Sequence, residues 1–121
     1  MVRRLAAALE GKTPLPARWT VDAVTFAPGQ AVVPVEAQAV EEDLATVLAA
    51  HPGARILLVG AGDTNAATPE ALQLAESRAE TLKYDLVSRG IAPDRIGVTT
   101  GVDGARAALT DRRVELVLVA R

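Results

Sequence analysis

The stretch ILLVGAGDTNAA, residues Ile56–Ala67, decides how the middle of this chain folds. Its beginning is an almost continuous apolar run, which is typical of a strand buried on both faces. Gly60, Gly62 and Asp63 follow directly. Two glycines after such a strand fit the turn of a dinucleotide-binding βαβ unit, but they also fit a strand end that presents one carboxylate.

The dinucleotide interpretation fails on three points. The third glycine of the fingerprint would fall at Asn65, where close packing of helix and sheet needs Gly or Ala. The acid expected about 20 residues further on would fall inside a helix, near Lys83 or Asp85. That helix begins at Thr68, too far along the chain for its amides to bind a pyrophosphate at Gly60. The sequence therefore favours a strand end that presents Asp63.

The segment after this strand end predicts a long amphipathic helix. Thr68-Pro69-Glu70 supplies a hydroxyl cap, a proline in the first turn and an acid near the helix N-terminus. Gly90 stands where a left-handed C-terminal cap is expected. Between them, apolar residues at spacings of three and four form one buried stripe: Leu72, Ala75, Ala79, Leu82 and Leu86.

The remaining elements are predicted from shorter patterns. Residues 1–10 form a short helix, residues 11–18 a proline-containing linker, and residues 19–26 (WTVDAVTF) a strand that APGQ ends. Residues 36–50 form a helix with Glu41, Glu42 and Asp43 on its solvated side and an apolar face of Val40, Leu44, Val47 and Leu48. Residues 96–100 and 113–120 form two further strands.

These elements predict an α/β two-layer sandwich in the order β-α-β-α-β-β. We expect a four-stranded mixed sheet with two helices on one face, in which the last two strands pair directly. A division into an N-terminal helix and linker, residues 1–18, and one domain, residues 19–121, follows from the same pattern.

Composition excludes several classes of function. The chain has 121 residues, a formal net charge of −2 and only three aromatic residues, so neither the charge nor the aromatic content of a nucleic-acid-binding protein is present. With no cysteine and a single histidine, His51, it offers no thiolate or multi-histidine metal site and no nucleophile–base pair for an enzyme, and we expect no cofactor. No apolar run reaches the roughly 18 residues of a membrane span, and the one at residues 5–9 is too short for a signal peptide.

An ordered set of motifs runs through most of the chain. Gly60 and Asp63 are followed fifteen residues after Asp63 by Arg78 in LAESRA, and DRRVE stands at residues 111–115. This order resembles the OmpA-like domain of bacterial cell envelopes, which includes the OmpA, Pal and MotB modules, and whose pattern is approximately GHTD, L-S-x-x-R-A and N/D-R-R-V-E. Phe26 stands where that family has a phenylalanine at the end of its first strand, and GIAPDRI, residues 90–96, is similar to its usual connection into the third strand.

The resemblance implies a non-catalytic domain that anchors a parent envelope protein to peptidoglycan. It implies that Asp63 accepts hydrogen bonds from the ammonium of a stem-peptide diaminopimelate, and that Arg78 binds the carboxylate through two parallel hydrogen bonds. Phe26, Gly62 and Arg112 complete the implied site. It also implies a periplasmic, outer-membrane-associated location and other domains of a longer envelope protein as partners.

Several positions differ from the family pattern and support an alternative. Ala61 replaces a His or Tyr, Gly62 a Thr or Ala, Ala66 a loop glycine and Ala71 an asparagine. The alternative function is therefore an OmpA-like fold that has lost peptidoglycan binding and serves as a structural or protein-interaction module.

For single residues, interpretations without a ligand also stay open. Asp63 fits a solvated turn residue, and Arg78 fits a helix-surface ion pair with Glu76 or Asp85. Phe26 fits the core, while Trp19 fits either the base of the core or a contact with another domain.

Overall fold

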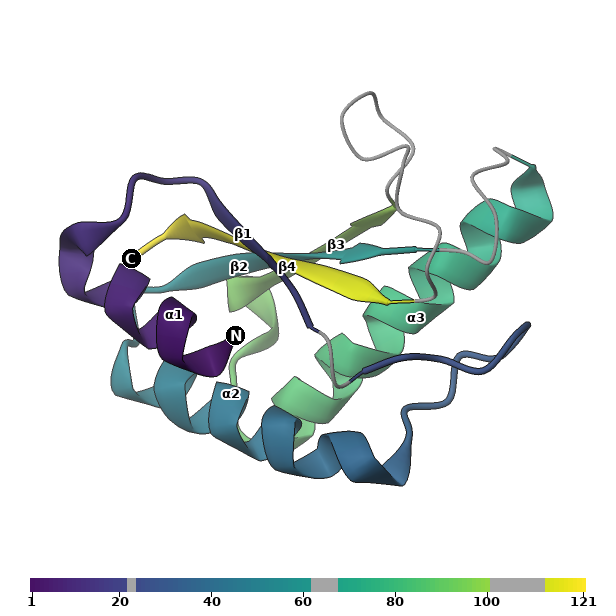
Figure 1. Cartoon of the computed structure of the whole chain (residues 1–121), viewed down its shortest axis with the longest axis horizontal. Helices are drawn as coiled ribbons and strands as arrows, with labels where there is room; N and C mark the ends of the chain where they lie inside the picture. Colours follow the sequence, from purple (N-terminus) through teal and green to yellow (C-terminus); the bar gives the residue numbers. More distant parts are fainter. Residues whose placement is uncertain (22–23, 62–67, 101–112) are drawn as a thin grey trace.

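A computed structural model describes residues 1–21, 24–61, 68–100 and 113–121 of the chain. The strands are β1 (Ala17–Thr20), β2 (Arg55–Gly60), β3 (Ile96–Thr100) and β4 (Val114–Ala120), and the α-helices are α1 (Val2–Ala7), α2 (Gln38–Ala50) and α3 (Pro69–Ser88). Short helical turns cover Ala8–Lys12, Val35–Ala37 and Pro93–Arg95. The helices lie on one side of the sheet (Figure 1), so the predicted α/β two-layer sandwich is confirmed.

One pairing of strands in the sheet differs from the prediction. The sheet runs β1-β4-β2-β3, with β4 antiparallel to both β1 and β2, and with β3 parallel to β2. The prediction that the last two strands pair directly is therefore wrong. β4 is suited to the centre because its side chains are buried on both faces, Leu116 and Leu118 in the core and Val117 on the opposite face.

The first strand lies earlier in the sequence than predicted. We expected residues 19–26, whereas β1 covers Ala17–Thr20 and Phe26 lies outside any strand. Val21 still donates its N–H to the carbonyl of Val114 at 2.9 Å. After Val21 the chain leaves the sheet, since Val24 donates back to the carbonyl of Val21 instead of to a neighbouring strand.

The N-terminal segment packs on the same core as the rest of the domain. Leu5, Ala8 and Leu9 belong to one cluster with the buried residues of the sheet and of α2 and α3. β1 also runs across residue 18. The predicted boundary after residue 18 stays a prediction. Residues before it pack on the same core as residues after it.

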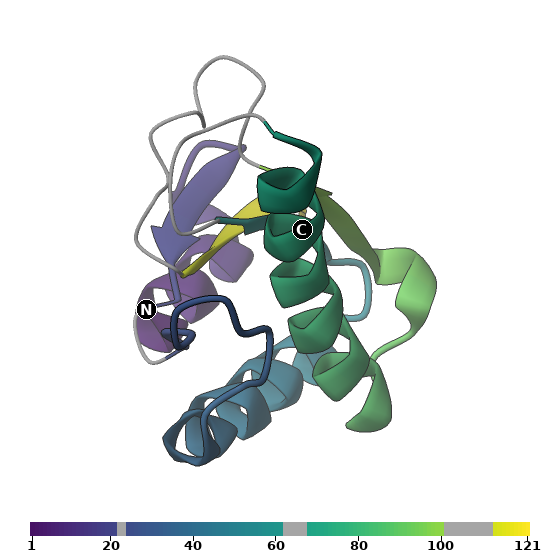
Figure 2. The ribbon, with the colours of Figure 1, turned by 90° about the vertical axis from the view of Figure 1, so that its right-hand side faces the viewer.

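Helix α3 begins and ends as its sequence predicts. Thr68 caps it by accepting a hydrogen bond from the N–H of Ala71 at 3.2 Å, and Gly90 follows its end with a φ of +100°. In Figure 2, α3 stands in front of the sheet and α2 crosses below it. The predicted stripe faces the core, with Leu72 only half-buried and the rest fully buried: Ala75, Ala79, Leu82 and Leu86.

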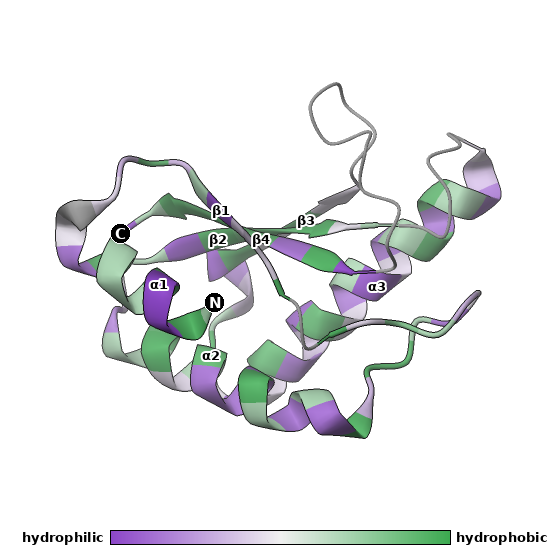
Figure 3. Ribbon diagram, in the orientation of Figure 1, coloured by the Kyte–Doolittle hydropathy of each residue, from purple (hydrophilic) through white to green (hydrophobic). Residues whose placement is uncertain are grey.

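The buried face of helix α2 is rotated about the helix axis relative to the buried face that its sequence predicts. Glu41 is only 1% exposed and is buried together with Leu44, Ala45 and Leu48, so the prediction that Glu41 is solvated is wrong. The two apolar residues expected on the buried face, Val40 and Val47, are only half-buried. Figure 3 shows hydrophilic and hydrophobic residues alternating closely along α2, which explains why periodicity alone misplaces the face.

Gly60 permits close packing of α3 on β2. A Cβ at this position would lie 1.8 Å from the carbonyl oxygen of Ala75, a main-chain atom that only a movement of α3 could displace. We expect Gly60→Ala to lower the free energy of unfolding by about 2 kcal/mol, measured by urea denaturation.

Gly97→Ala is the matched control for this variant. Its Cβ would lie 3.0 Å from Leu57 Cδ1, a flexible side chain that can move away, and 3.9 Å from the carbonyl oxygen of Ile56, which is an ordinary contact distance. A loss from Gly60→Ala no larger than the loss from Gly97→Ala would contradict the packing argument.

Candidate functional site

A tight turn follows Phe26 and lies against α3. Pro28 and Gly29 occupy its two central positions, Gly29 has a φ of +70°, and Gln30 donates its N–H to the carbonyl of Ala27 at 3.0 Å. Proline followed by a residue of positive φ is the pattern of a type II turn. The turn directs the carbonyls of Ala27 and Gln30 toward the buried face of α3.

Arg78 of α3 joins this turn to the end of β2. Its side chain is 0% exposed. Nε donates to the carbonyl of Gln30 at 2.8 Å, Nη1 to that of Ala61 at 3.0 Å, and Nη2 to that of Ala27 at 3.2 Å. One guanidinium therefore connects three segments that lie far apart in the sequence. The interpretation of Arg78 as a helix-surface ion pair is wrong, because the side chain is buried.

Phe26 forms one wall of the arginine site. The Arg78 guanidinium carbon lies 5.3 Å from the centre of the Phe26 ring, within the range of a cation–π contact. Phe26 itself is only 1% exposed and belongs to the core cluster. The structure thus brings two of the predicted site residues together.

The other three predicted site residues, Gly62, Asp63 and Arg112, lie outside the described residues. Their described chain neighbours do meet at this corner of the sheet. Ala61, directly before Gly62 in the sequence, donates its N–H to the carbonyl of Arg113 at 3.1 Å, and its own carbonyl accepts from Arg78. Arg113 directly follows Arg112 in the sequence.

Three of the hydrogen-bond partners of the buried Arg78 guanidinium are neutral main-chain carbonyls. A guanidinium carries five N–H donors in a planar fork, and these carbonyls engage all three of its nitrogens. A cation removed from water favours an anion beside it. A guanidinium in this position is suited to holding a carboxylate and to fixing loops.

An apolar hollow of about 530 Å³ adjoins the turn. Its lining includes Phe26, Ala27 and Gln30, as well as Val32 and Val35, which are 72% and 75% exposed. Sequence reasoning did not find this surface, because isolated valines in a loop carry no pattern.

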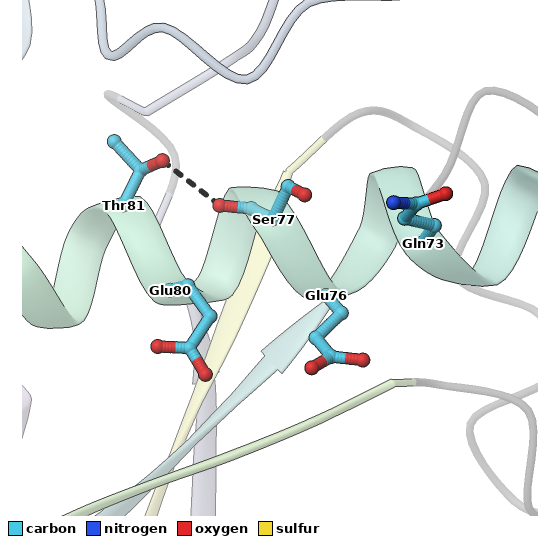
Figure 4. A pocket seen from close by; sticks show the side chains of 5 residues that line it. All are labelled: Gln73, Glu76, Ser77, Glu80 and Thr81. Atoms are coloured by element: carbon cyan, nitrogen blue, oxygen red, sulfur yellow. Dashed lines mark hydrogen bonds between the residues drawn. The ribbon is translucent and has the colours of Figure 1, made fainter.

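A second hollow, of about 460 Å³, lies on another face of α3 and has a different character (Figure 4). Glu76 and Glu80 lie one turn apart on this face, and Thr81 donates its hydroxyl hydrogen to the carbonyl of Ser77 at 2.8 Å. Two like charges one turn apart repel each other slightly. Its lining residues, which also include Gln73, comprise carboxylates, hydroxyls and an amide, without a basic group.

Within residues 1–21, 24–61, 68–100 and 113–121, no three His, Cys, Asp or Glu side chains are grouped so that they could hold a metal ion. None of the helices described there has the length and apolar character needed to cross a membrane.

The last strand, β4, lies between β1 and β2, the helices cover one face of the sheet, and the Arg78 side chain contacts the end of β2. This combination is typical of a known class of small α/β domain. The model of the OmpA family matches residues 25–115, and the chain belongs to this family. A search of curated proteins gives no match.

Solved structures of this class share the fold at low sequence identity. The peptidoglycan-associated lipoprotein from Burkholderia pseudomallei is 23% identical with a TM-score of 0.64, over 81% of this chain and 88% of that one. The periplasmic domain of Helicobacter pylori MotB (residues 78–256) is 15% identical with a TM-score of 0.64, over 85% and 74%. An outer membrane protein from Borrelia burgdorferi B31 is 14% identical with a TM-score of 0.70, over 91% and 95%.

Proposed function

We propose that this chain is a non-catalytic domain that anchors a parent cell-envelope protein to peptidoglycan, with Asp63 and Arg78 binding the free end of diaminopimelate. The observation that carries the proposal is the buried guanidinium of Arg78, fixed within a domain of the OmpA family at the end of β2. Asp63 follows Ala61 by two residues in the sequence.

The proposed ligand is a zwitterion, and the two side chains have matching charges. The carboxylate of Asp63 accepts from the ligand ammonium, and the guanidinium of Arg78 donates to the ligand carboxylate. Gly62 and Arg112 are proposed to border the same site, and Phe26 to hold the Arg78 plane in position. The apolar hollow beside Ala27 and Val32 is suited to the aliphatic part of the stem peptide. This function agrees with the names of two structural relatives, a peptidoglycan-associated lipoprotein and a periplasmic domain.

The test is a titration with meso-diaminopimelate, followed by NMR chemical shifts, on the full chain and on Asp63→Asn. The asparagine keeps the shape of the side chain but removes the charge that attracts the ammonium. We expect saturable shifts in the wild type and at least a tenfold weaker affinity in the variant, equivalent to about 1.4 kcal/mol.

Asp43→Asn is the control, because Asp43 is an exposed acid on α2, a different element. Sedimentation with diaminopimelate-containing and lysine-containing peptidoglycan tests the same specificity on the polymer. Shifts that are absent at millimolar ligand, or equal in wild type and Asp63→Asn, would refute the proposed site.

One observation favours a second function, an OmpA-like fold that acts as a structural or protein-interaction module. The contacts of Arg78 with three main-chain carbonyls would give the residue a structural role even without a ligand. In that case the protein would not sediment with peptidoglycan, and Asp63→Asn would leave its behaviour unchanged.

A further inference from the structure

A polar pocket lies between α1 and β1 and shares no lining residue with the Arg78 corner. Met1 and Arg4 line it from the N-terminal segment, and Arg18, Trp19 and Thr20 line it from β1. Successive side chains of a strand point to opposite faces. A pocket that touches three consecutive residues of β1 therefore wraps around the outer edge of this strand, which has β4 on only one side in the described sheet.

The pocket carries two arginines with little neutralising charge. Within the described part of the chain, the Arg4 guanidinium makes no hydrogen bond or ion pair, and its side chain is exposed. Arg18 has one contact with a carboxylate, 3.4 Å from its Nη1 to Glu115 Oε1, while its side chain stays 42% exposed. None of the lining residues is acidic. This pocket therefore attracts anions.

Trp19 and Thr20 give the pocket further binding groups. The Trp19 side chain is half-buried and packs against the core, yet it also lines the pocket. Its ring offers a flat apolar wall, and the Thr20 hydroxyl is one more donor. The volume of about 460 Å³ exceeds what a bare anion fills and lies in the range of pockets for small organic ligands.

We propose that this pocket binds a phosphate ester. Arg4 and Arg18 donate hydrogen bonds to the phosphate oxygens, Thr20 donates one more, and the Trp19 ring covers the organic part of the ligand. Arg4 supplies a positive charge for a phosphate ester and Arg18 part of another, since Arg18 also pairs with Glu115, and the planar donors of both match the oxygen geometry of the ester. The proposal is independent of peptidoglycan binding, because none of these residues belongs to the corner around Arg78.

The chain reports on this pocket directly, because Trp19 is its only tryptophan. The experiment follows Trp19 fluorescence at constant ionic strength while the full chain is titrated with glycerol 3-phosphate, with inorganic phosphate, or with glycerol as the uncharged control. Parallel titrations use vesicles of phosphatidylglycerol and of phosphatidylcholine, which separate a lipid headgroup from a soluble ester. We expect a saturable change with glycerol 3-phosphate and none with glycerol.

Arg4→Gln and Arg18→Gln test the two arginines, and Arg55→Gln is the matched control at an exposed arginine of β2. We expect each of the first two variants to weaken binding at least tenfold, and the control to leave it unchanged. A response to glycerol 3-phosphate alone supports the pocket as a site for a soluble ester. A response to both glycerol 3-phosphate and phosphatidylglycerol supports a pocket that also binds a lipid headgroup. No saturable response in any titration, or a response independent of Arg4 and Arg18, overturns it.

Discussion

Arg78→Met is expected to lower the free energy of unfolding by about 4 kcal/mol, the cost typical of removing a buried, hydrogen-bonded charged group. Methionine keeps most of the aliphatic length, so the loss reports on the guanidinium and not on a large cavity. Without it, the carbonyls of Ala27, Gln30 and Ala61 lose a donor from Arg78, and the hydrogen bond to Ala61 is fully buried. Urea denaturation measures the change in stability, and amide exchange of residues 27–30 locates it.

Arg55→Met provides the matched control. Arg55 is exposed and donates one hydrogen bond, from Nη1 to the carbonyl of Asp94 at 3.1 Å. We expect it to cost less than about 1 kcal/mol. The loss of unfolding free energy from Arg78→Lys should lie between those from Arg78→Met and Arg55→Met, because an ammonium keeps the charge but cannot reproduce the planar donor geometry of a guanidinium. Equal losses for Arg78→Met and Arg55→Met would show that the arginine does not hold the turn.

Because of Glu41, we expect the free energy of unfolding to fall as the pH rises. An acid in a salt bridge has the opposite effect. The pKa of Glu41 is raised from 4.5 to about 8, chiefly by burial and also by a hydrogen bond and charge repulsion from Asp85, while Arg89 opposes the shift. The Glu41 carboxylate lies 3.9 Å from Arg89, measured from Oε1 to Nη2. These groups face each other across the interface of α2 and α3. At neutral pH, Glu41 is therefore protonated and can donate to Asp85.

The sign follows from comparing the folded and unfolded chains. The unfolded chain releases the Glu41 proton near pH 4.5, and the folded chain keeps it until about pH 8. Folding therefore takes up a proton in this window, and stability falls as the pH rises, by at most about 1.4 kcal/mol per pH unit. At pH 7 the accumulated loss from this group is on the order of 3 kcal/mol.

Glu41→Gln is expected to remove this loss, because the amide is neutral at every pH and keeps a donor for Asp85. The variant should be more stable than the wild type by about 3 kcal/mol at pH 7, with a much smaller difference at pH 4. Thermal and urea unfolding between pH 4 and 9 measure both slopes. Glu42→Gln, at the exposed neighbouring residue, should leave the slope unchanged. Parallel pH profiles for wild type and Glu41→Gln would contradict the argument.

The elements of this fold could be predicted from sequence more reliably than their pairing. The cap at Thr68, the stripe on α3 and the left-handed Gly90 are local patterns, and the structure confirms them. The position of β4 between β1 and β2 depends on contacts between residues far apart in the sequence, and no local pattern determines it. The burial of Glu41 was missed for the same reason, since an acid becomes tolerable there only through Asp85 and Arg89 of another helix.

The site was predictable in its residue types and not in its contacts. The fifteen-residue spacing from Asp63 to Arg78 indicated an arginine near a strand end, and the side chain of Arg78, on α3, does donate to the carbonyl of Ala61, the residue after β2. Its partners, the carbonyls of Ala27, Gln30 and Ala61, belong to the main chain and have no signature in the side-chain sequence. The segment APGQ, which contains Pro28 and Gly29, predicted the end of a strand, but not that a turn there would pack against α3.

The central place of β4 has a consequence for how the protein is made in the cell. Because β4 follows the other three strands in the sequence and fills the gap between β1 and β2, the sheet is incomplete until residues 114–120 have left the ribosome. Until then both β1 and β2 lack a neighbour, and exposed strand edges invite pairing with other chains. We therefore expect premature termination before Val114 to yield aggregates in place of a shortened domain, and nascent chains of this protein to depend on chaperones until β4 has emerged.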